Sequence, residues 1–474
     1  MMLRPAAPHR VTVTPGIVAD ACRGALISGS ANTPCNAFSI DSRTLNTGDL
    51  FFAITGDRFD GHRFAAAALD AGARGVVVSD LSAMPVRPAE AAVILVSDTT
   101  RALQDLARFV RRASGSTVVA VTGSAGKTTT KEVLSTLLAA RFDVFRSEGN
   151  FNNHIGLPLS LLRLCDGPDI AVVELGMNHA GEIRVLTAIA EPDVRVWTLV
   201  AEVHQAFFPS IEAIADAKAE MLESATPETL VVANAADARV MSRVRRCPAR
   251  VVTFGIDVDA DISASEVVNH GVAGTTAMVT AMGARVPIVV PLIGRGHLAN
   301  VLAAAAVALE FGVPMGEITE RVGRLVPAAR RGEVRRLRDG VTVVDDSYNS
   351  NPRALERMLE AVASAQPAGR RVAVLGEMLE LGDASLPLHR DCGRAAARAG
   401  LGALVTVGGD AARALGAAAI EAGMPASAVT HAPTSDEAAG QVDHVIRAGD
   451  LVLVKGSRGI RTDVVVDRIV AMWA

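Results

Sequence analysis

The stretch Val118-Val-Ala-Val-Thr-Gly-Ser-Ala-Gly-Lys-Thr-Thr-Thr130 joins an apolar run to a glycine turn and then to a pattern typical of a helix. A buried strand followed by such a turn and a helix forms a cradle for nucleotide phosphates, because backbone N–H groups point at the phosphate oxygens. The common G-x-x-x-x-G-K-[ST] pattern is incomplete here, since Val121 stands where its first glycine would be. The shorter T-G-x-x-G-K-T form remains, and it predicts nucleotide binding within an α/β fold.

Each residue type in this loop has a chemical reason to be there. The two glycines let the backbone approach phosphate oxygens closely, Lys127 can neutralise the β- and γ-phosphates, and the Thr128 hydroxyl can ligate Mg²⁺. The predicted nucleotide contacts in the loop are Gly123, Ser124, Ala125, Gly126, Lys127, Thr128 and Thr129. ATP and Mg²⁺ are therefore the expected cofactors.

Composition predicts a large soluble enzyme. The chain has 474 residues, of which 50% are hydrophobic and 21% charged, and at ~150 residues per domain this length suggests about three domains. The net charge of −4 exerts no bulk attraction for nucleic acid, so phosphate binding must come from local sites. We expect small-molecule partners.

The cysteines and the start of the chain favour the cytoplasm. Five cysteines without C-x-x-C spacing argue against a paired disulfide framework: Cys22, Cys35, Cys165, Cys247 and Cys392. Residues 1–10 lack an apolar signal region, and no apolar run approaches the ~18 residues of a membrane span. A cytoplasmic protein without a membrane span is expected.

Apolar runs divide the chain into three α/β domains, predicted at residues 1–113, 114–325 and 326–474. In the central domain, strands alternate with helices after 129, after 181 and through 218, which predicts a mainly parallel sheet with helices on both faces. A β-rich stretch, 250–291, precedes an alanine-rich helix, 298–311, that reads as buried packing. Further strands are expected at 118–122, 170–175, 194–200 and 230–234, then in a Rossmann-like third domain at 341–344, 372–375, 403–407 and 451–454.

Several separated motifs resemble the Mur ligases, ATP-dependent amino acid or peptide ligases of cell-wall precursor synthesis. Besides the phosphate loop they are Asn152-Asn-His-Ile-Gly-Leu-Pro158, Glu174-Leu-Gly-Met-Asn-His-Ala-Gly-Glu182, Asp345-Asp-Ser-Tyr-Asn-Ser-Asn-Pro352, Gly376-Glu-Met-Leu-Glu-Leu-Gly382 and Lys455-Gly-Ser-Arg-Gly459. Together they look like the MurF subfamily. The resemblance implies ligation of D-alanyl-D-alanine to UDP-N-acetylmuramoyl-tripeptide through an acyl phosphate, with ATP converted to ADP and phosphate.

The resemblance also implies a metal set. Thr128 and Glu174 would hold Mg²⁺ between phosphate oxygens, and both supply the oxygen donors that this ion prefers. His204 matches a ligand of a second metal ion. Lys218 aligns with a lysine that is carbamylated in the family, a change that turns a cation into an anionic oxygen ligand. With Lys127, His204 and Lys218 form the expected catalytic set.

The same resemblance implies further site residues. Ser42 and Arg43 match the region that binds the UDP end of the muropeptide, and an arginine can bind phosphate oxygens bidentately. Asn300, Arg331 and Asp346 are expected at the nucleotide. The candidates for the ribose, the dipeptide or substrate carboxylates are Asn349, Asn351, Lys455 and Arg458.

Two departures from the family pattern bear on the join between the second and third domains. The usual Arg-His-Asn reads Arg295-Gly-His297 here, which leaves the role of His297 open. The usual Pro-x-x-Gly-Arg reads Pro327-Ala-Ala-Arg-Arg331, so Arg330 replaces the glycine. A differently shaped hinge is one consequence of that replacement.

Three alternatives stay open. Another Mur ligase that adds a single amino acid shares the ATP site, but its Asp-Asn-Pro-Arg hallmark is absent from the loop at Thr406-Val-Gly-Gly-Asp410. Folylpolyglutamate synthase shares the phosphate loop without the other motifs. A P-loop ATPase that drives a conformational switch is the third. The residue types do not separate meso-diaminopimelate from lysine in the tripeptide, and a monomer is expected.

Overall fold

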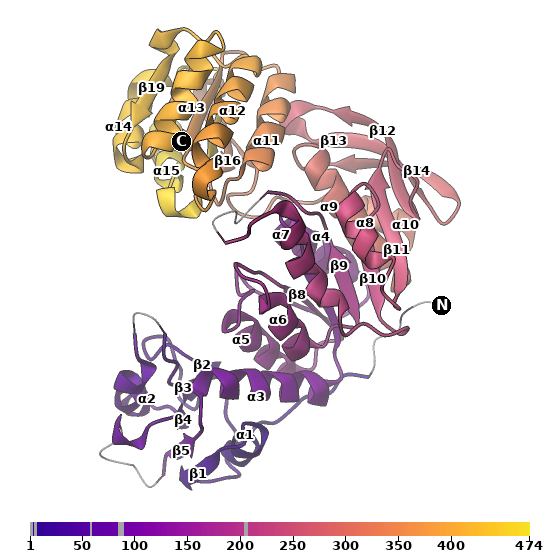
Figure 1. Cartoon of the computed structure of the whole chain (residues 1–474), viewed down its shortest axis with the longest axis vertical. Coiled ribbons are helices and arrows are strands. Elements are labelled where there is room, and N and C mark those ends of the chain that lie inside the picture. Colours follow the sequence, from indigo (N-terminus) through magenta and orange to yellow (C-terminus); the bar gives the residue numbers. More distant parts are fainter. Residues whose placement is uncertain (1–2, 4–6, 57–58, 84–89, 203–206) are drawn as a thin grey trace.

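The computed structural model describes Leu3 and residues 7–56, 59–83, 90–202 and 207–474. Figure 1 shows three lobes in chain order, with the N-terminal and C-terminal lobes at opposite ends of the long axis. Each lobe is built on its own sheet, of five, nine and six strands. The predicted fold class, three α/β domains with mainly parallel sheets, is confirmed, while the boundaries near 113 and 325 stay predictions.

The N-terminal sheet has the order β1-β5-β4-β3-β2, in which β1 alone is antiparallel to its neighbour. Its strands are β1 (Ala25–Ser28), β2 (Phe38–Ser39), β3 (Leu50–Phe52), β4 (Gly75–Val78) and β5 (Ala92–Leu95). The helices α1 (Pro15–Ala21) and α2 (Ala65–Asp70) belong to this lobe.

The central sheet has the order β14-β13-β12-β11-β10-β9-β6-β8-β7. The strands β6 to β12 run parallel with β7 at one edge, and β13 and β14 are antiparallel at the other. The strands are β6 (Thr117–Thr122), β7 (Val144–Arg146), β8 (Ile170–Glu174), β9 (Val194–Trp197), β10 (Leu230–Asn234), β11 (Arg250–Ile256), β12 (Ile262–Asn269), β13 (Thr275–Ala281) and β14 (Ala284–Val290). The helices are α4 (Lys127–Leu138), α5 (Gly156–Leu162), α6 (Glu182–Ala190), α7 (Ile211–Ala219), α8 (Ala238–Val244), α9 (Arg295–Glu310) and α10 (Met315–Val322).

The C-terminal sheet has the order β15-β16-β20-β17-β18-β19, parallel except for β15 at its edge. Its strands are β15 (Glu333–Arg336), β16 (Thr342–Asp346), β17 (Arg371–Gly376), β18 (Ala403–Val407), β19 (Val429–Ala432) and β20 (Leu451–Lys455). The helices are α11 (Pro352–Ser364), α12 (Ser385–Arg398), α13 (Asp410–Glu421), α14 (Ser435–Val445) and α15 (Asp463–Trp473).

The lobes are joined in two different ways. The helix α3 (Thr99–Ser114) packs on α5 and α6, and one continuous core of buried side chains runs from the N-terminal lobe into the central one. The C-terminal lobe has cores of its own and meets the central lobe mainly where Ile293 and Val272 pack against it. A cleft between the second and third lobes follows from this narrow join. In the described part of the chain, no helix combines the length and apolar character needed to cross a membrane.

Candidate active site

A cleft of about 630 Å³ lies between the central and C-terminal lobes. Its central wall comes from the phosphate loop, the ends of β8 and β9 and the start of α9, and its C-terminal wall from the segments after β16, β17 and β20. These are the carboxyl ends of parallel strands, where α/β sheets present ligand-binding groups. The motifs separated in sequence therefore converge on one cavity.

The phosphate loop has the backbone conformation that its glycines allow. Gly126 has φ +85° and caps α4, while Gly123 has φ +149°. Thr198 directly follows β9, and its hydroxyl donates a hydrogen bond of 2.6 Å to Ala125 O in the loop. A Cβ on residue 123 would lie 1.9 Å from the oxygen of that hydroxyl. Only a glycine fits at position 123.

Lys127 is the first residue of α4, and its ammonium donates to Gly123 O over 2.9 Å. Burial lowers the pKa of Lys127, while the nearby carboxylate of Glu174 opposes that shift. This hydrogen bond holds the Lys127 ammonium against the backbone of the phosphate loop.

Glu174 ends β8 and is 2% exposed. Among the described residues its Oε1 accepts no hydrogen bond, but it forms an ion pair of 3.4 Å with the Nζ of Lys131, a fully buried lysine that donates to Ser147 O over 2.5 Å. A buried carboxylate oxygen that accepts no hydrogen bond can still take a further partner. It is a suitable ligand position for a cation at this edge of the sheet.

The oxygen donors in the cleft suit a Mg²⁺ ion that is bound jointly by protein and substrate, rather than a metal ion bound by protein side chains alone. Among the described residues no group of three or more His, Cys, Asp or Glu side chains could hold a metal ion. Mg²⁺ is commonly bound by one or two carboxylates together with substrate phosphates and water. Glu174, whose Oε1 accepts no hydrogen bond from the described residues, and Thr128, which has a hydroxyl, both line the cleft and meet that requirement.

Lys218 lies near the end of α7, is 2% exposed and makes no ion pair with any residue in the described ranges. Burial lowers the pKa of Lys218 well below its usual value, and the positive charge of Lys127 acts in the same direction. Lys127 and Lys218 are thus close enough for the charge of Lys127 to influence the titration of Lys218. His204 lies outside the described residues, so its expected role stays a prediction.

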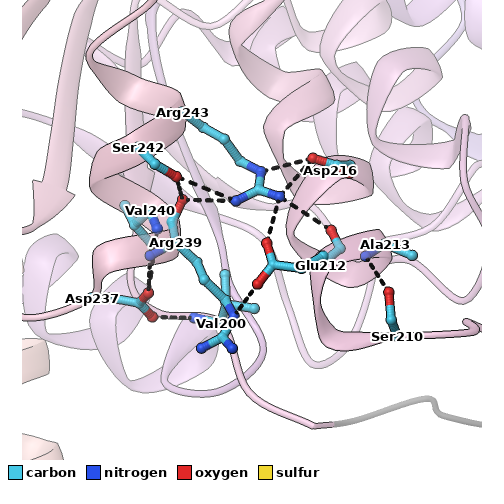
Figure 2. A network of polar contacts seen from close by, with 10 residues as sticks. All are labelled: Val200, Ser210, Glu212, Ala213, Asp216, Asp237, Arg239, Val240, Ser242 and Arg243. Atoms are coloured by element: carbon cyan, nitrogen blue, oxygen red, sulfur yellow. Dashed lines mark hydrogen bonds and ion pairs between the residues drawn. The ribbon is translucent and has the colours of Figure 1, made fainter.

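A surface network fixes the helix that carries Lys218, and Figure 2 shows how it links α7 to α8. From α8, Arg243 Nη2 contacts Glu212 Oε2 at 3.0 Å and Asp216 Oδ1 at 2.7 Å, both on α7. Asp237 caps α8 and also accepts a hydrogen bond of 2.8 Å from the Val200 amide, beyond β9. The position of α7 is therefore coupled to the segment that leads toward His204.

The C-terminal wall contains an ion pair and an aromatic ring. Lys455 is buried, and its ammonium lies 2.6 Å from Asp346 Oδ2 and donates to Asn349 O. The two charged residues are register partners on β20 and β16. The Tyr348 ring lies below the guanidinium of Arg331 at 4.1 Å. All of these residues line the cleft, so the structure brings these candidates together.

Two candidates on this wall have structural partners. Asn351 caps α11, because its Oδ1 accepts from the Ala354 amide over 2.9 Å. Arg458 donates to the Tyr348 hydroxyl over 3.3 Å. Both still line the cleft, although the helix cap already uses the Oδ1 of Asn351.

Both departures from the family pattern lie at the join between the central and C-terminal lobes. Arg330 has φ +61°, the left-handed conformation that favours the glycine it replaces, and its guanidinium pairs with Asp463 at 2.8 Å. His297 Nδ1 donates a hydrogen bond of 2.7 Å to Ile293 O, and burial lowers the pKa of this imidazole. We interpret His297 as a fixed packing residue at the start of α9.

The remaining predicted residues divide between the cleft and the N-terminal lobe. Asn300 is buried on α9 beside the phosphate loop, where a Cβ on Gly126 would lie 2.3 Å from its Oδ1. Ser42 and Arg43 do not line the cleft. They lie in a turn after β2, where Arg43 pairs with Asp41 and lowers the pKa of that carboxyl to about 2.

Among the residues of the site that were not predicted are Lys131 and Thr198. Lys131 looks like a surface lysine of a helix, but it is the fourth residue after Lys127 and shares its helix face, which is the available signal. Thr198 follows an apolar strand, and a polar residue at a strand end in an α/β sheet is the corresponding signal. The motifs also meet as expected, since the Gly176 amide donates to Asn152 O over 2.8 Å.

Comparison with known proteins agrees with this geometry. Family models match residues 35–111 ("Mur ligase family, catalytic domain"), 121–308 ("Mur ligase middle domain") and 330–458 ("Mur ligase, glutamate ligase domain"). A UDP-N-acetylmuramoyl-tripeptide–D-alanyl-D-alanine ligase from Bacillus subtilis is 32% identical over 460 residues, 96% of this chain and 97% of that protein.

Solved structures are similar along the whole chain. A crystal structure of MurF from Acinetobacter baumannii has a TM-score of 0.87 at 27% identity, covering 98% of this chain and 99% of that one. MurF from Thermotoga maritima in complex with ADP has a TM-score of 0.79 at 28% identity, covering 92% and 97%. The chain belongs to the Mur ligase family, in the branch of the UDP-N-acetylmuramoyl-tripeptide–D-alanyl-D-alanine ligases.

Proposed function

We propose that the chain joins D-alanyl-D-alanine to UDP-N-acetylmuramoyl-tripeptide and converts ATP to ADP and phosphate. The observation that carries this proposal is a phosphate loop that faces, across one cleft, a C-terminal wall able to hold a second substrate. The names of its relatives supply the substrates. The product is the UDP-muramoyl-pentapeptide precursor of peptidoglycan.

The chemistry needs an activated carboxyl group, because a carboxylate is a poor acyl donor at neutral pH. An oxygen of the tripeptide carboxylate attacks the γ-phosphorus and ADP leaves, which gives an acyl phosphate. The dipeptide amine then attacks the acyl carbon, loses a proton and expels phosphate, which keeps one carboxylate oxygen. The amide bond and one phosphate are the net result.

Within that sequence, Lys127 neutralises charge on the transferred phosphoryl group, and the loop amides hold the other phosphates. Thr128 and Glu174 are the residues that would hold Mg²⁺. Mg²⁺ bound there would neutralise negative charge on the phosphate groups. Lys131 keeps the Glu174 carboxylate in place from the buried side.

Lys218 is the candidate for carbamylation. A buried amine with a lowered pKa is more often neutral, and a neutral amine can attack CO₂ to give a carbamate. The negative charge so formed would give the Lys127 ammonium an anionic partner. The expected role of His204 near this group belongs to the same proposal.

The C-terminal lobe supplies the dipeptide side. Asp346, Asn349, Lys455 and Arg458 line that wall and remain our candidates for nucleotide and dipeptide contacts. Ser42 and Arg43 remain candidates for the UDP end. Closure of the lobes about the Arg330 join would exclude water from the acyl phosphate and align the amine.

ADP release, measured with one substrate omitted at a time, tests this function. We expect turnover only when UDP-N-acetylmuramoyl-tripeptide and D-alanyl-D-alanine are both present, and none with Lys127→Ala. Turnover with ATP alone would favour a switch ATPase. Turnover with a shorter muropeptide and a single amino acid would favour another Mur ligase, and turnover with a folate and glutamate would favour folylpolyglutamate synthase.

A further inference from the structure

Arg357 is a basic side chain of the cleft that has no hydrogen-bond or close ion-pair partner among the described residues. It lies in the second turn of α11 and lines the cavity, yet its guanidinium makes no hydrogen bond or ion pair with any residue that the structure describes. The other lysine and arginine side chains that line the cleft all have partners: Lys127, Arg331, Lys455 and Arg458.

The surroundings of Arg357 destabilise its positive charge in the folded protein. Burial lowers the pKa of Arg357, and Arg353, one helical turn earlier, adds a like charge on the same side of α11, while Glu360, one turn later, opposes that shift. A cation taken from water without a close partner destabilises the fold. Glu360 makes no ion pair with Arg357, so a ligand in the cleft is the close partner that its position allows.

The structure relates this guanidinium to the phosphate loop. Arg357 Nη1 lies 3.2 Å from the place where a Cβ on Gly296 would be, so it lies over the first turn of α9. Asn300 is one turn further along α9, and its Oδ1 lies 2.3 Å from the corresponding point on Gly126. Gly296 and Asn300 share one helix face, so about 6 Å along α9 separates the loop from Arg357.

We propose that Arg357 stacks its guanidinium on the base of the bound adenine nucleotide, an inference that rests on the proposed ATP-dependent function. A nucleotide whose phosphates lie in the loop directs its ribose and base out of it, and the α9 face leads to Gly296. Because Gly296 has no side chain, the Arg357 guanidinium can lie close over this turn of α9. Ile293 and Met358, both buried and both in the cleft lining, provide apolar edges. A planar guanidinium stacks on aromatic rings.

Equilibrium binding of ADP with Mg²⁺ to the full chain tests this assignment. We expect Arg357→Ala to raise the Kd for ADP on the order of tenfold, and Arg357→Lys to recover only part of the loss because an ammonium is not planar. Arg353→Ala is the matched control on the same helix, exposed and outside the cleft lining, and should leave the Kd unchanged. Thermal melts of both alanine variants should not fall below that of the wild type.

Inorganic tripolyphosphate separates the base from the phosphates. Its Kd should be the same for the wild type and Arg357→Ala, because it has no base to stack. An equal loss for ADP and tripolyphosphate would overturn the proposal in favour of phosphate binding. An unchanged Kd for ADP would also overturn it, and a raised KM for D-alanyl-D-alanine would then assign Arg357 to the dipeptide carboxylate. A wild type that binds no ADP would refute the proposed function itself.

Discussion

Replacing Lys131 with Met removes a fully buried cation that lies 3.4 Å from the Glu174 carboxylate. At an effective dielectric constant of 20, two charges at that separation attract by about 5 kcal/mol, part of which offsets the cost of taking both from water. The lost hydrogen bond to Ser147 O adds about 1 kcal/mol. Since breaking a buried pair from one side costs about 3–5 kcal/mol, we expect the free energy of unfolding of the central lobe to fall by about 3 kcal/mol.

The assay is urea unfolding followed by tryptophan fluorescence. The chain has two tryptophans, so a Trp473→Phe background leaves the buried Trp197 of the central lobe as the reporter. In a Glu174→Gln background, Lys131→Met should cost only about 1 kcal/mol, because no unpaired carboxylate remains. Equal losses in the two backgrounds would refute the pairing. Glu132→Gln is the control: this carboxylate is also 3.4 Å from Lys131 but is 28% exposed, so its loss should cost under about 1 kcal/mol.

Three further predictions concern the join, α7 and the C-terminal lobe. Arg330→Gly should leave the Tm unchanged or raise it. Glycine removes the backbone strain of a left-handed arginine, worth about 1 kcal/mol, and this gain offsets the loss of the partly exposed ion pair with Asp463. A clear fall in Tm would count against strain at this position. Arg243→Met should slow ligation on the order of tenfold with ADP affinity unchanged, as kcat and ADP titration will report, because it frees α7 without touching the phosphate loop. Burial lowers the pKa of His389, whose Nε2 accepts from the Met378 amide, so the unfolded chain binds a proton that the folded chain excludes. The wild-type Tm should therefore fall as the pH drops below about 6.5, and His389→Gln should flatten that slope; equal slopes would contradict it.

Much of the fold could be predicted because runs of apolar residues indicate buried strands. The expected strands 230–234 and 403–407 match β10 and β18 residue for residue. The expected strand 194–200 is wrong at its end, since β9 stops at Trp197. Val200 is buried without strand pairing, so the apolar pattern there reports burial alone. The helix expected from Thr129 begins two residues earlier, at Lys127, because Gly126 caps it.

The site was predictable where one segment carries its chemistry and less so where distant segments meet. The phosphate loop follows from a local strand, turn and helix. The pair between Lys455 and Asp346 depends on β20 lying beside β16, an order that the sequence pattern does not specify. The ammonium of the buried Lys131 donates to Ser147 O, beyond the edge strand β7, and the sequence pattern does not specify that contact. The cytoplasmic location, the monomeric state and the metal set stay predictions.

Mass spectrometry of the reaction with a tripeptide labelled with ¹⁸O in its terminal carboxylate tests the central claim most directly. With ATP, Mg²⁺ and D-alanyl-D-alanine, the muropeptide should gain the mass of the dipeptide less one labelled water equivalent, and the released phosphate should carry one ¹⁸O, because the acyl phosphate breaks at the acyl carbon. Lys127→Ala should give neither product. A muropeptide of unchanged mass beside unlabelled phosphate would contradict the account, because ATP would then be hydrolysed without ligation.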